Sequence, residues 1–191
     1  DKKLLKTLRD LVTTFEEIKK SRLADSSIQI PENIDVTKRI FFTVGEFYEF
    51  RSVIELSPVQ YQRFFRADYS WQQQFMKSFF VSDVIIPEIA LRFGQWIPKG
   101  EVEVMDGCQR MSTVMLFREG ELSLPNDDEL KSVYIPGLDY PVDLRGKNWK
   151  QHPQRVRDYI DNYELQSQVY KDLTPARAGE IFVDVLNNQN T

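Results

Sequence analysis

The chain has 191 residues, of which 41% are hydrophobic and 13% aromatic, and its formal net charge is -4 at pH 7. This length and composition predict one domain with a sizeable buried core and a small added element. The negative charge argues against a surface that is basic throughout, so any phosphate-binding site is expected to be local.

The start of the chain lacks a secretory signal pattern, and no stretch approaches the roughly 18 apolar residues of a membrane span. We therefore expect a cytoplasmic protein that makes no membrane contact. The single cysteine, Cys108, excludes an internal disulfide and fits a reducing compartment. The single histidine, His152, excludes a histidine-rich metal site, and its place before Pro153 in a polar stretch predicts a solvated side chain.

The first segment predicts an amphipathic helix over residues 1–20. Its apolar residues recur at three- and four-residue spacing: Leu4, Leu8, Leu11, Phe15 and Ile18. The stripe fits a helix that packs on its own domain or one that pairs with another subunit, and two to three heptads leave both open. Residues 21–38 turn polar and predict a linker. We expect an N-terminal helix and linker over 1–38 and one domain over 39–191.

Alternating and apolar runs predict the next elements. Residues 41–44 and 47–56 fit strands or a short helix, and the pattern leaves this open. Asp68 before Trp71 predicts a helix start, and the expected buried face of that helix is Phe75, Phe79 and Phe80. Residues 84–91 and 101–105 predict two strands, which Gly94 and residues 98–100 join as a hairpin.

The second half of the chain predicts three helices. The first covers residues 109–118 and follows the second strand directly, so Asp106 and Gly107 fall on a strand-to-helix turn. Loops are expected at residues 125–128 and 136–137, and further helices at 154–165 and 175–187.

A strand-to-helix turn offers backbone N–H groups and the positive end of a helix dipole, and both suit phosphate. Arg110 could fork onto two phosphate oxygens, and the hydroxyls of Ser112 and Thr113 could contact phosphate or a metal. Asp106 could bind Mg²⁺, orient a water or hold the arginine. The competing interpretation is an ordinary turn, because Asp-Gly before a helix is a common turn and N-cap signal.

A wider set of motifs occurs in the order that is typical of one family: Tyr61-Gln62-Arg63, Trp71, Ile86-Pro87-Glu88-Ile89, Asp106 to Thr113, the Gly137/Leu144 region and Ile181-Phe182 through Leu186-Asn187. Over about residues 57–191 the chain resembles the N-terminal domain of GmrSD-type restriction enzymes. The family pattern is a proline-flanked Tyr/Phe-Gln-Arg, a tryptophan, an apolar strand, Asp-Gly-Gln-Gln-Arg and a late Phe-x-x-Leu-Asn.

The resemblance implies an α+β, ParB/sulfiredoxin-like fold, a small mixed sheet with surrounding helices. It implies binding and hydrolysis of a nucleoside triphosphate with Mg²⁺, which regulates restriction of phage DNA in antiviral defence. The implied partners are DNA and a nuclease domain or subunit that this chain lacks, and an oligomer is compatible with it. No His-Asn-His nuclease, Walker or zinc pattern is present in the sequence, so this chain is not expected to cut DNA.

The family motif can be carried over position by position. It implies a part in catalysis for Asp106, Gln109 and Arg110, with Asp106 also as the metal ligand. The implied nucleotide-binding residues are Tyr61, Gln62, Arg63, Gly107, Cys108, Arg110, Ser112, Thr113 and Asn187. Tyr61 and Trp71 are expected to shape the pocket, and Trp71 has a structural role as an equal alternative.

Two positions depart from the family pattern. Cys108 stands at the first glutamine of the usual pair, and Asn190 stands where glycine is usual, so hydrolysis is expected to be weakened or lost while binding survives. Asn190 is the milder change, because asparagine tolerates positive φ. The family normally continues beyond Thr191, so we expect the domain to be truncated there, and a fragment, a trimmed chain and a short relative all stay open.

Two other functions compete with nucleotide hydrolysis. One is a non-catalytic DNA- or protein-binding adaptor with a decayed pocket, whose basic face would consist of Arg63, Arg66 and Arg92. The other follows from Gly107-Cys108-Gln109-Arg110, which resembles the Gly-Cys-His-Arg segment of sulfiredoxin. A helix start and a nearby arginine would both lower the pKa of the Cys108 thiol, as a redox role requires.

Overall fold

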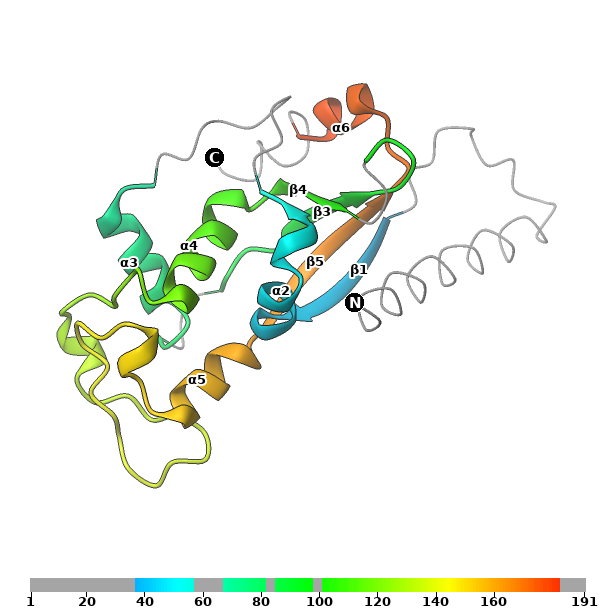
Figure 1. Cartoon of the computed structure of the whole chain (residues 1–191). Helices are drawn as coiled ribbons and strands as arrows, with labels where there is room; N and C mark the ends of the chain where they lie inside the picture. The colour runs from blue at the N-terminus through cyan, green and yellow to red at the C-terminus, as the bar shows by residue number, and fades with distance from the viewer. Residues whose placement is uncertain (1–36, 57–66, 82–84, 98–100, 183–191) are drawn as a thin grey trace.

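A mixed sheet with helices on both faces forms the described part of the chain, residues 37–56, 67–81, 85–97 and 101–182 of the computed structural model. Within these ranges five strands lie in the order β1-β5-β3-β4-β2 (Figure 1). Their bounds are β1 Thr37–Thr43, β2 Ile54–Glu55, β3 Ile89–Phe93, β4 Val102–Asp106 and β5 Glu164–Lys171. The expected α+β class is confirmed at this level. The helix predicted over 1–20 and the linker predicted over 21–38 lie outside these ranges, except for the last two linker residues, Thr37 and Lys38, which begin β1 and correct the predicted domain boundary.

Strands β3 and β4 pair as the sequence predicted. They are antiparallel, with Leu91 opposite Val104 and Arg92 opposite Glu103. The strand predicted over 84–91, however, begins only at Ile89, and Ile85 is 90% exposed. Pro87 gives the physical reason, because proline has no N–H to donate to a sheet ladder.

The prediction of a helix over 154–165 was wrong at its C-terminal end. Helix α5 covers Gln154–Asp161, and the amide Nδ2 of Asn162 donates to the Asp158 carbonyl at 2.8 Å where the helix ends. The following residues form β5, which pairs antiparallel with β1 and parallel with β3. The strand that the sequence did not predict is therefore an inner strand of the sheet.

Side-chain caps define the starts of two helices near the N-terminal end of the described chain. Residues 41–49, whose structure the sequence left open, form the end of β1 and then α2, Val44–Glu49. Thr43 and Glu46 form a capping box at its start. Helix α3, Tyr69–Lys77, begins as predicted after Asp68, whose carboxylate accepts the N–H of Trp71 at 2.7 Å.

The buried face of α3 differs from the predicted one. Gln72 and Met76 are its buried residues, while Phe75 is only partly buried. Phe79 is buried as expected, but it follows the helix end, and Phe80 is partly buried. The apolar positions 75, 79 and 80 were assigned to one long helix, whereas the helix ends at Lys77.

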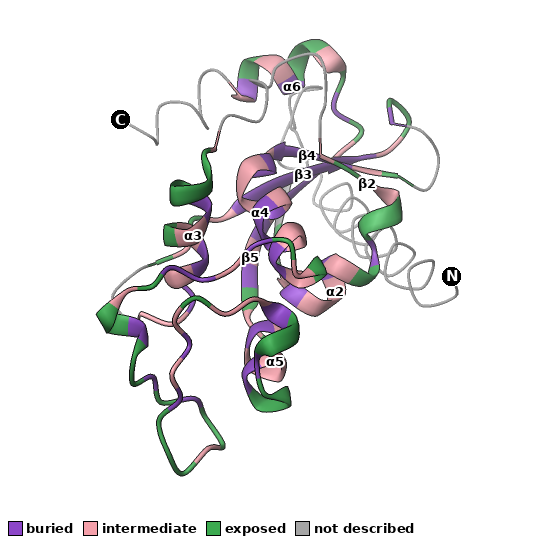
Figure 2. Ribbon diagram, turned by 60° about the vertical axis from the view of Figure 1, so that its left-hand side comes forward, coloured by how far each residue is buried: buried purple, intermediate pink, exposed green. Residues whose placement is uncertain are grey.

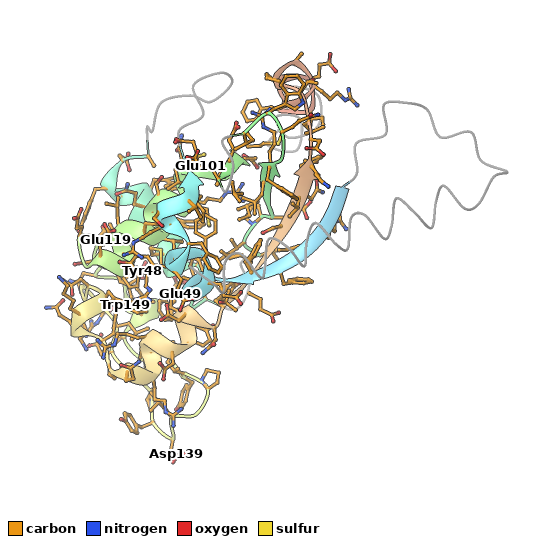
Figure 3. The ribbon with its side chains drawn as sticks, turned by 45° about the vertical axis from the view of Figure 1, so that its right-hand side comes forward. Tyr48, Glu49, Glu101, Glu119, Asp139 and Trp149 are labelled. Carbon is orange, nitrogen blue, oxygen red and sulfur yellow. The ribbon has the colours of Figure 1, made fainter. Side chains whose placement is uncertain are left out.

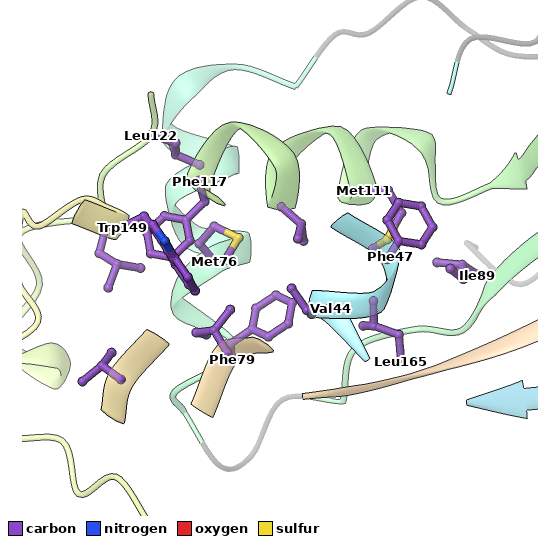
Figure 4. Packing of buried hydrophobic residues seen from close by; sticks show 14 of the residues in the cluster. Val44, Phe47, Met76, Phe79, Ile89, Met111, Phe117, Leu122, Trp149 and Leu165 are labelled. Carbon is purple, nitrogen blue, oxygen red and sulfur yellow. The ribbon is translucent and has the colours of Figure 1, made fainter. Parts of the chain in front are cut away.

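Most buried side chains lie on the face of the sheet that α2, α3, α4 (Cys108–Glu119) and α5 cover (Figures 2 and 4). The other face carries a smaller cluster below α6, Pro175–Ile181. Successive residues of a strand point to opposite faces, so Ile89 and Leu91 join the large cluster and Ala90 joins the small one. The small cluster consists of Ala90, Met105, Tyr170, Leu173, Ala178 and Ile181, with Phe182 against it.

His152 corrects the prediction of a solvated side chain. It is 4% exposed and its ring lies 5.9 Å from that of Phe117, centroid to centroid. Burial lowers the pKa of His152 to about 4, and the nearby charge of Lys147 acts in the same direction. The short helical turn Trp149–Gln151 carries the chain inward before Pro153, which the polar local sequence did not indicate.

The guanidinium of Arg118 contacts residues from three other elements of the chain. Its guanidinium lies 4.4 Å from the ring centroid of Tyr48 and 4.2 Å from that of Trp149 (both residues labelled in Figure 3). Its Nε also lies 2.9 Å from the Asp161 carboxylate. This arrangement fixes α2 and α5 against the C-terminal end of α4. In the ranges that the structure covers, no helix is long and apolar enough to cross a membrane.

Candidate functional site

The predicted strand-to-helix turn exists at the end of β4. The strand ends at Asp106, and Gly107 has φ 99° and is the N-cap of the 12-residue helix α4. Among the described residues no side chain caps this helix start. A Cβ on Gly107 would lie 2.7 Å from Cγ2 of Ile89, so both the backbone angle and the available space require glycine.

Arg110 is held by three hydrogen bonds within the protein. Its Nη2 donates to Oδ2 of Asp106 at 2.8 Å, four residues earlier in the chain. Its Nη1 donates to the backbone carbonyls of Pro87, at 2.6 Å, and Glu88, at 3.2 Å. The Arg110 side chain is 14% exposed. The guanidinium therefore ties the first turn of α4 to the chain segment that leads into β3.

Asp106 makes one of the three contacts considered for it, the one that holds the arginine. It does not cap α4, because Gly107 occupies the N-cap position. Only Oδ2 of its carboxylate takes part in the ion pair, and the described residues supply no partner for Oδ1. They also contain no group of three or more histidine, cysteine, aspartate or glutamate side chains that could hold a metal. A Mg²⁺ ion here would need ligands from a phosphate and water.

Two predicted site residues point into the protein. Sγ of Cys108 donates to the carbonyl of Val104 at 3.2 Å and is buried. Oγ1 of Thr113 donates to the carbonyl of Gln109 at 2.8 Å, and Thr113 is fully buried. A thiol in the core is a poor nucleophile, so this geometry gives no support to a sulfiredoxin-like reaction. Gln109 and Ser112 are partly exposed on the same helix.

The remaining predicted pocket residues fall into two groups. Tyr61, Gln62, Arg63 and Asn187 lie outside the described residues, as do Arg66 and Asn190. Trp71 is 41% exposed and stacks on Phe75 with ring centroids 5.4 Å apart.

Arg92 does not belong to an exposed basic face that could bind DNA. Arg92 is 3% exposed, and its Nη2 and Nε donate to Oε2 of Glu103 at 2.5 and 3.1 Å. This prediction was wrong for Arg92, because β3 places the side chain under the loop that leads to α6, where Leu173 offers its carbonyl at 3.5 Å.

Sequence reasoning missed the polar residues behind the turn. Gln168 of β5 donates from Nε2 to Oε1 of Glu88 at 2.7 Å, and its Oε1 accepts the Tyr170 hydroxyl at 2.7 Å. Gln166 and Gln168 alternate with Leu165, Ser167 and Val169, two of which are apolar, and this alternation is a strand signal that could have located them.

Comparisons of the chain with protein-family models, with curated proteins and with solved structures found no match.

Proposed function

We propose that this chain binds a nucleoside triphosphate with Mg²⁺ at the Asp106–Gly107 turn and so regulates a DNA restriction system of the GmrSD type. One observation carries the proposal: the start of α4 receives no side-chain cap from the described residues and lies beside a carboxylate and a guanidinium held 2.8 Å apart. An uncapped helix start beside a fixed cation is an arrangement that suits phosphate.

Each residue would act on the nucleotide in a definite way. Phosphate oxygens would accept N–H groups from the first turn of α4, and the helix dipole would favour their charge. The guanidinium of Arg110 has more N–H donors than its three internal bonds use, so it can reach a phosphate without leaving Asp106. Gln109, partly exposed on the first turn, would orient the attacking water.

A single carboxylate such as Asp106 suits a Mg²⁺ ion that is bound mainly by phosphates. Mg²⁺ commonly takes one or two carboxylates, keeps several waters and neutralises the phosphate charge. Oδ1 of Asp106 suits contact with such a water while Oδ2 holds Arg110.

The wider assignment rests on the resemblance. The mixed sheet and the strand–glycine–helix turn are compatible with a ParB/sulfiredoxin-like fold, and Tyr61, Gln62, Arg63 and Asn187 would complete the pocket. A nuclease domain or subunit would respond to the bound state, and DNA would be its substrate. The setting would be the cytoplasm, as in phage defence.

Isothermal titration with each of the four ribonucleoside triphosphates and Mg²⁺ tests the proposal. We expect saturable binding that Arg110→Ala abolishes. Arg145→Ala is the matched control, because Arg145 forms a comparable pair with Asp143 at 2.7 Å in a separate loop. Binding by Arg110→Ala equal to that of Arg145→Ala, or no binding by the unaltered chain, would contradict the proposal. Phosphate release separates hydrolysis from binding alone, and Gln109→Ala should lose release while it still binds, because Gln109 would orient the attacking water.

An adaptor without nucleotide chemistry is the second candidate. The observation that favours it is that Arg110 already has internal partners for its guanidinium. Such an adaptor would bind DNA with an affinity that depends strongly on salt concentration, or it would bind a protein. Titration with the four triphosphates would then show no binding.

A further inference from the structure

Glu88 connects the two faces of the sheet. Its backbone carbonyl accepts Nη1 of Arg110 at 3.2 Å on the side of α4. Its side chain lies on the opposite side, where Oε1 accepts Nε2 of Gln168 at 2.7 Å and Oε2 lies 3.6 Å from Nε of Arg39. A shift of Glu88 therefore changes contacts on both faces.

Gln168 has its amide fixed at both ends. Nε2 donates to Glu88 and Oε1 accepts the Tyr170 hydroxyl, so the orientation of the amide is determined by its partners. Tyr170 is 4% exposed and belongs to the cluster that α6 covers, with Leu173, Ala178 and Ile181. One continuous set of hydrogen bonds thus runs from the contact surface of α6 to the Asp106–Arg110 pair.

We propose that Gln168 and Tyr170 are positioning residues that couple the packing of α6 to the geometry of the Asp106–Gly107 turn. A ligand that draws on Arg110 would shift the Glu88 carbonyl and, through Gln168, the Tyr170 hydroxyl under α6. A partner that moves α6 would alter Arg110 by the same route, since coupling between two sites is reciprocal. The inference deepens the proposed function, because it names α6 as the element that reports the bound nucleotide.

Gln168→Glu and Tyr170→Phe test the coupling at its two middle members. Gln168→Glu puts a carboxylate against Glu88 at pH 7 and removes the donor, whereas Tyr170→Phe removes only the hydroxyl. Gln166→Glu is the matched control. Gln166 lies two residues earlier on the same face of β5, and the described residues give its side chain no hydrogen-bond partner.

The first readout needs no nucleotide. NMR signals of the Arg110 side chain and the Gly107 amide report the turn, and hydrogen exchange of α6 amides reports the helix. We expect Gln168→Glu and Tyr170→Phe to change both sets and Gln166→Glu to change neither. Repulsion from Glu88 raises the pKa of the new carboxyl group, and the Arg39 guanidinium beside Glu88 opposes this shift. As the pH falls the carboxyl group becomes protonated and can donate to Glu88, so the Gln168→Glu signals should return toward those of the unaltered chain at the same pH. A role in stability alone would not give this rescue.

The second readout is titration with ATP and Mg²⁺. We expect Gln168→Glu to weaken binding about fivefold at pH 7, and ATP to slow α6 exchange in the unaltered chain but not in this variant. If Gln168→Glu and Tyr170→Phe give the same results as Gln166→Glu in both readouts, the proposed coupling is wrong. If no triphosphate binds but the Arg110 and α6 signals still respond to Gln168→Glu and Tyr170→Phe together, the proposed function fails and the coupling stands.

Discussion

The carboxylate of Asp172 occupies the space that a side chain on Gly94 would need. Asp172 has φ 58°, an uncommon angle for a residue other than glycine, and its Oδ1 accepts the N–H of Gln95 at 2.9 Å. Its own N–H donates to the carbonyl of Phe93, also at 2.9 Å. These contacts fix the ends of β3 and β5 together and set the direction in which the chain enters α6.

Gly94→Ala should destabilise the protein strongly. Gly94 has φ 123°, and a Cβ would collide with the Asp172 carboxylate. We expect the free energy of unfolding to fall by roughly 1–3 kcal/mol more than in Gly146→Ala, where φ is 64° and no described residue lies within 4 Å of the added Cβ. Urea unfolding of the two variants measures the difference. Equal losses would mean that backbone angle alone explains the glycine.

Gly107→Ala should disturb the turn as well as the stability. The added Cβ would lie 2.7 Å from Cγ2 of Ile89, so the turn or Ile89 must move, and it would touch Nη2 of Arg110 at 3.4 Å, so a movement of the turn is expected to reach the Arg110 side chain. Gly137→Ala is the control, since its φ is 83° and no described residue lies within 4 Å of the added Cβ. We expect the free energy of unfolding of Gly107→Ala to fall by roughly 1–3 kcal/mol more than that of the control. Only Gly107→Ala should change the Arg110 NMR signals. An unchanged Arg110 spectrum would contradict this geometry.

The stability of the protein should fall between neutral and mildly acidic pH because of His152. Its pKa is about 4 in the folded chain and 6.5 ordinarily, so between these values the unfolded chain binds more protons. The contribution of neutral His152 to the free energy of unfolding is therefore fully present above pH 6.5. It is lost as the pH falls toward 4, and at pH 5 the loss is about 2 kcal/mol.

Urea unfolding of His152→Leu at pH 7 and pH 5 measures this contribution. The variant should lose about 2 kcal/mol less than the unaltered chain on acidification. Leu144→Ala, a fully buried change without a titrating group, should lower stability equally at both pH values. If the drop from pH 7 to pH 5 is the same with and without His152, the histidine is not the cause.

The Arg92–Glu103 pair should show strong non-additivity. Both residues are buried, at 3% and 5% exposure, and Nη2 lies 2.5 Å from Oε2. Glu103→Leu alone leaves the buried Arg92 charge without this partner and should cost roughly 3–5 kcal/mol. Arg92→Met should cost less, because burial raises the pKa of Glu103 to about 7 and its carboxyl group can become protonated. The double variant should lose much less than the sum. A double-variant cycle by thermal unfolding measures this, and additive losses would show that the two charges do not interact.

Local sequence signals were sufficient where one segment defines its own structure. Asp68 starts α3, the alternation at residues 101–105 gives β4, and Gly107 marks the turn into α4. The helix predicted over 109–118 lies inside α4, and Pro175 opens α6 as predicted. Each of these signals depends on backbone geometry or on a cap within a few residues of the element.

The sequence by itself predicted both strands and helices and put Asp106, Gly107 and Arg110 at one turn, because these follow from local spacing, whereas the α+β class was what the resemblance implied. Only the tertiary structure decided what that turn contacts. It brought the carbonyls of Pro87 and Glu88 to Arg110, turned Cys108 into the core, and made β5 an inner strand behind the site. Partners 20 or more residues apart meet only when the sheet assembles, so no local pattern can specify which donor finds which acceptor.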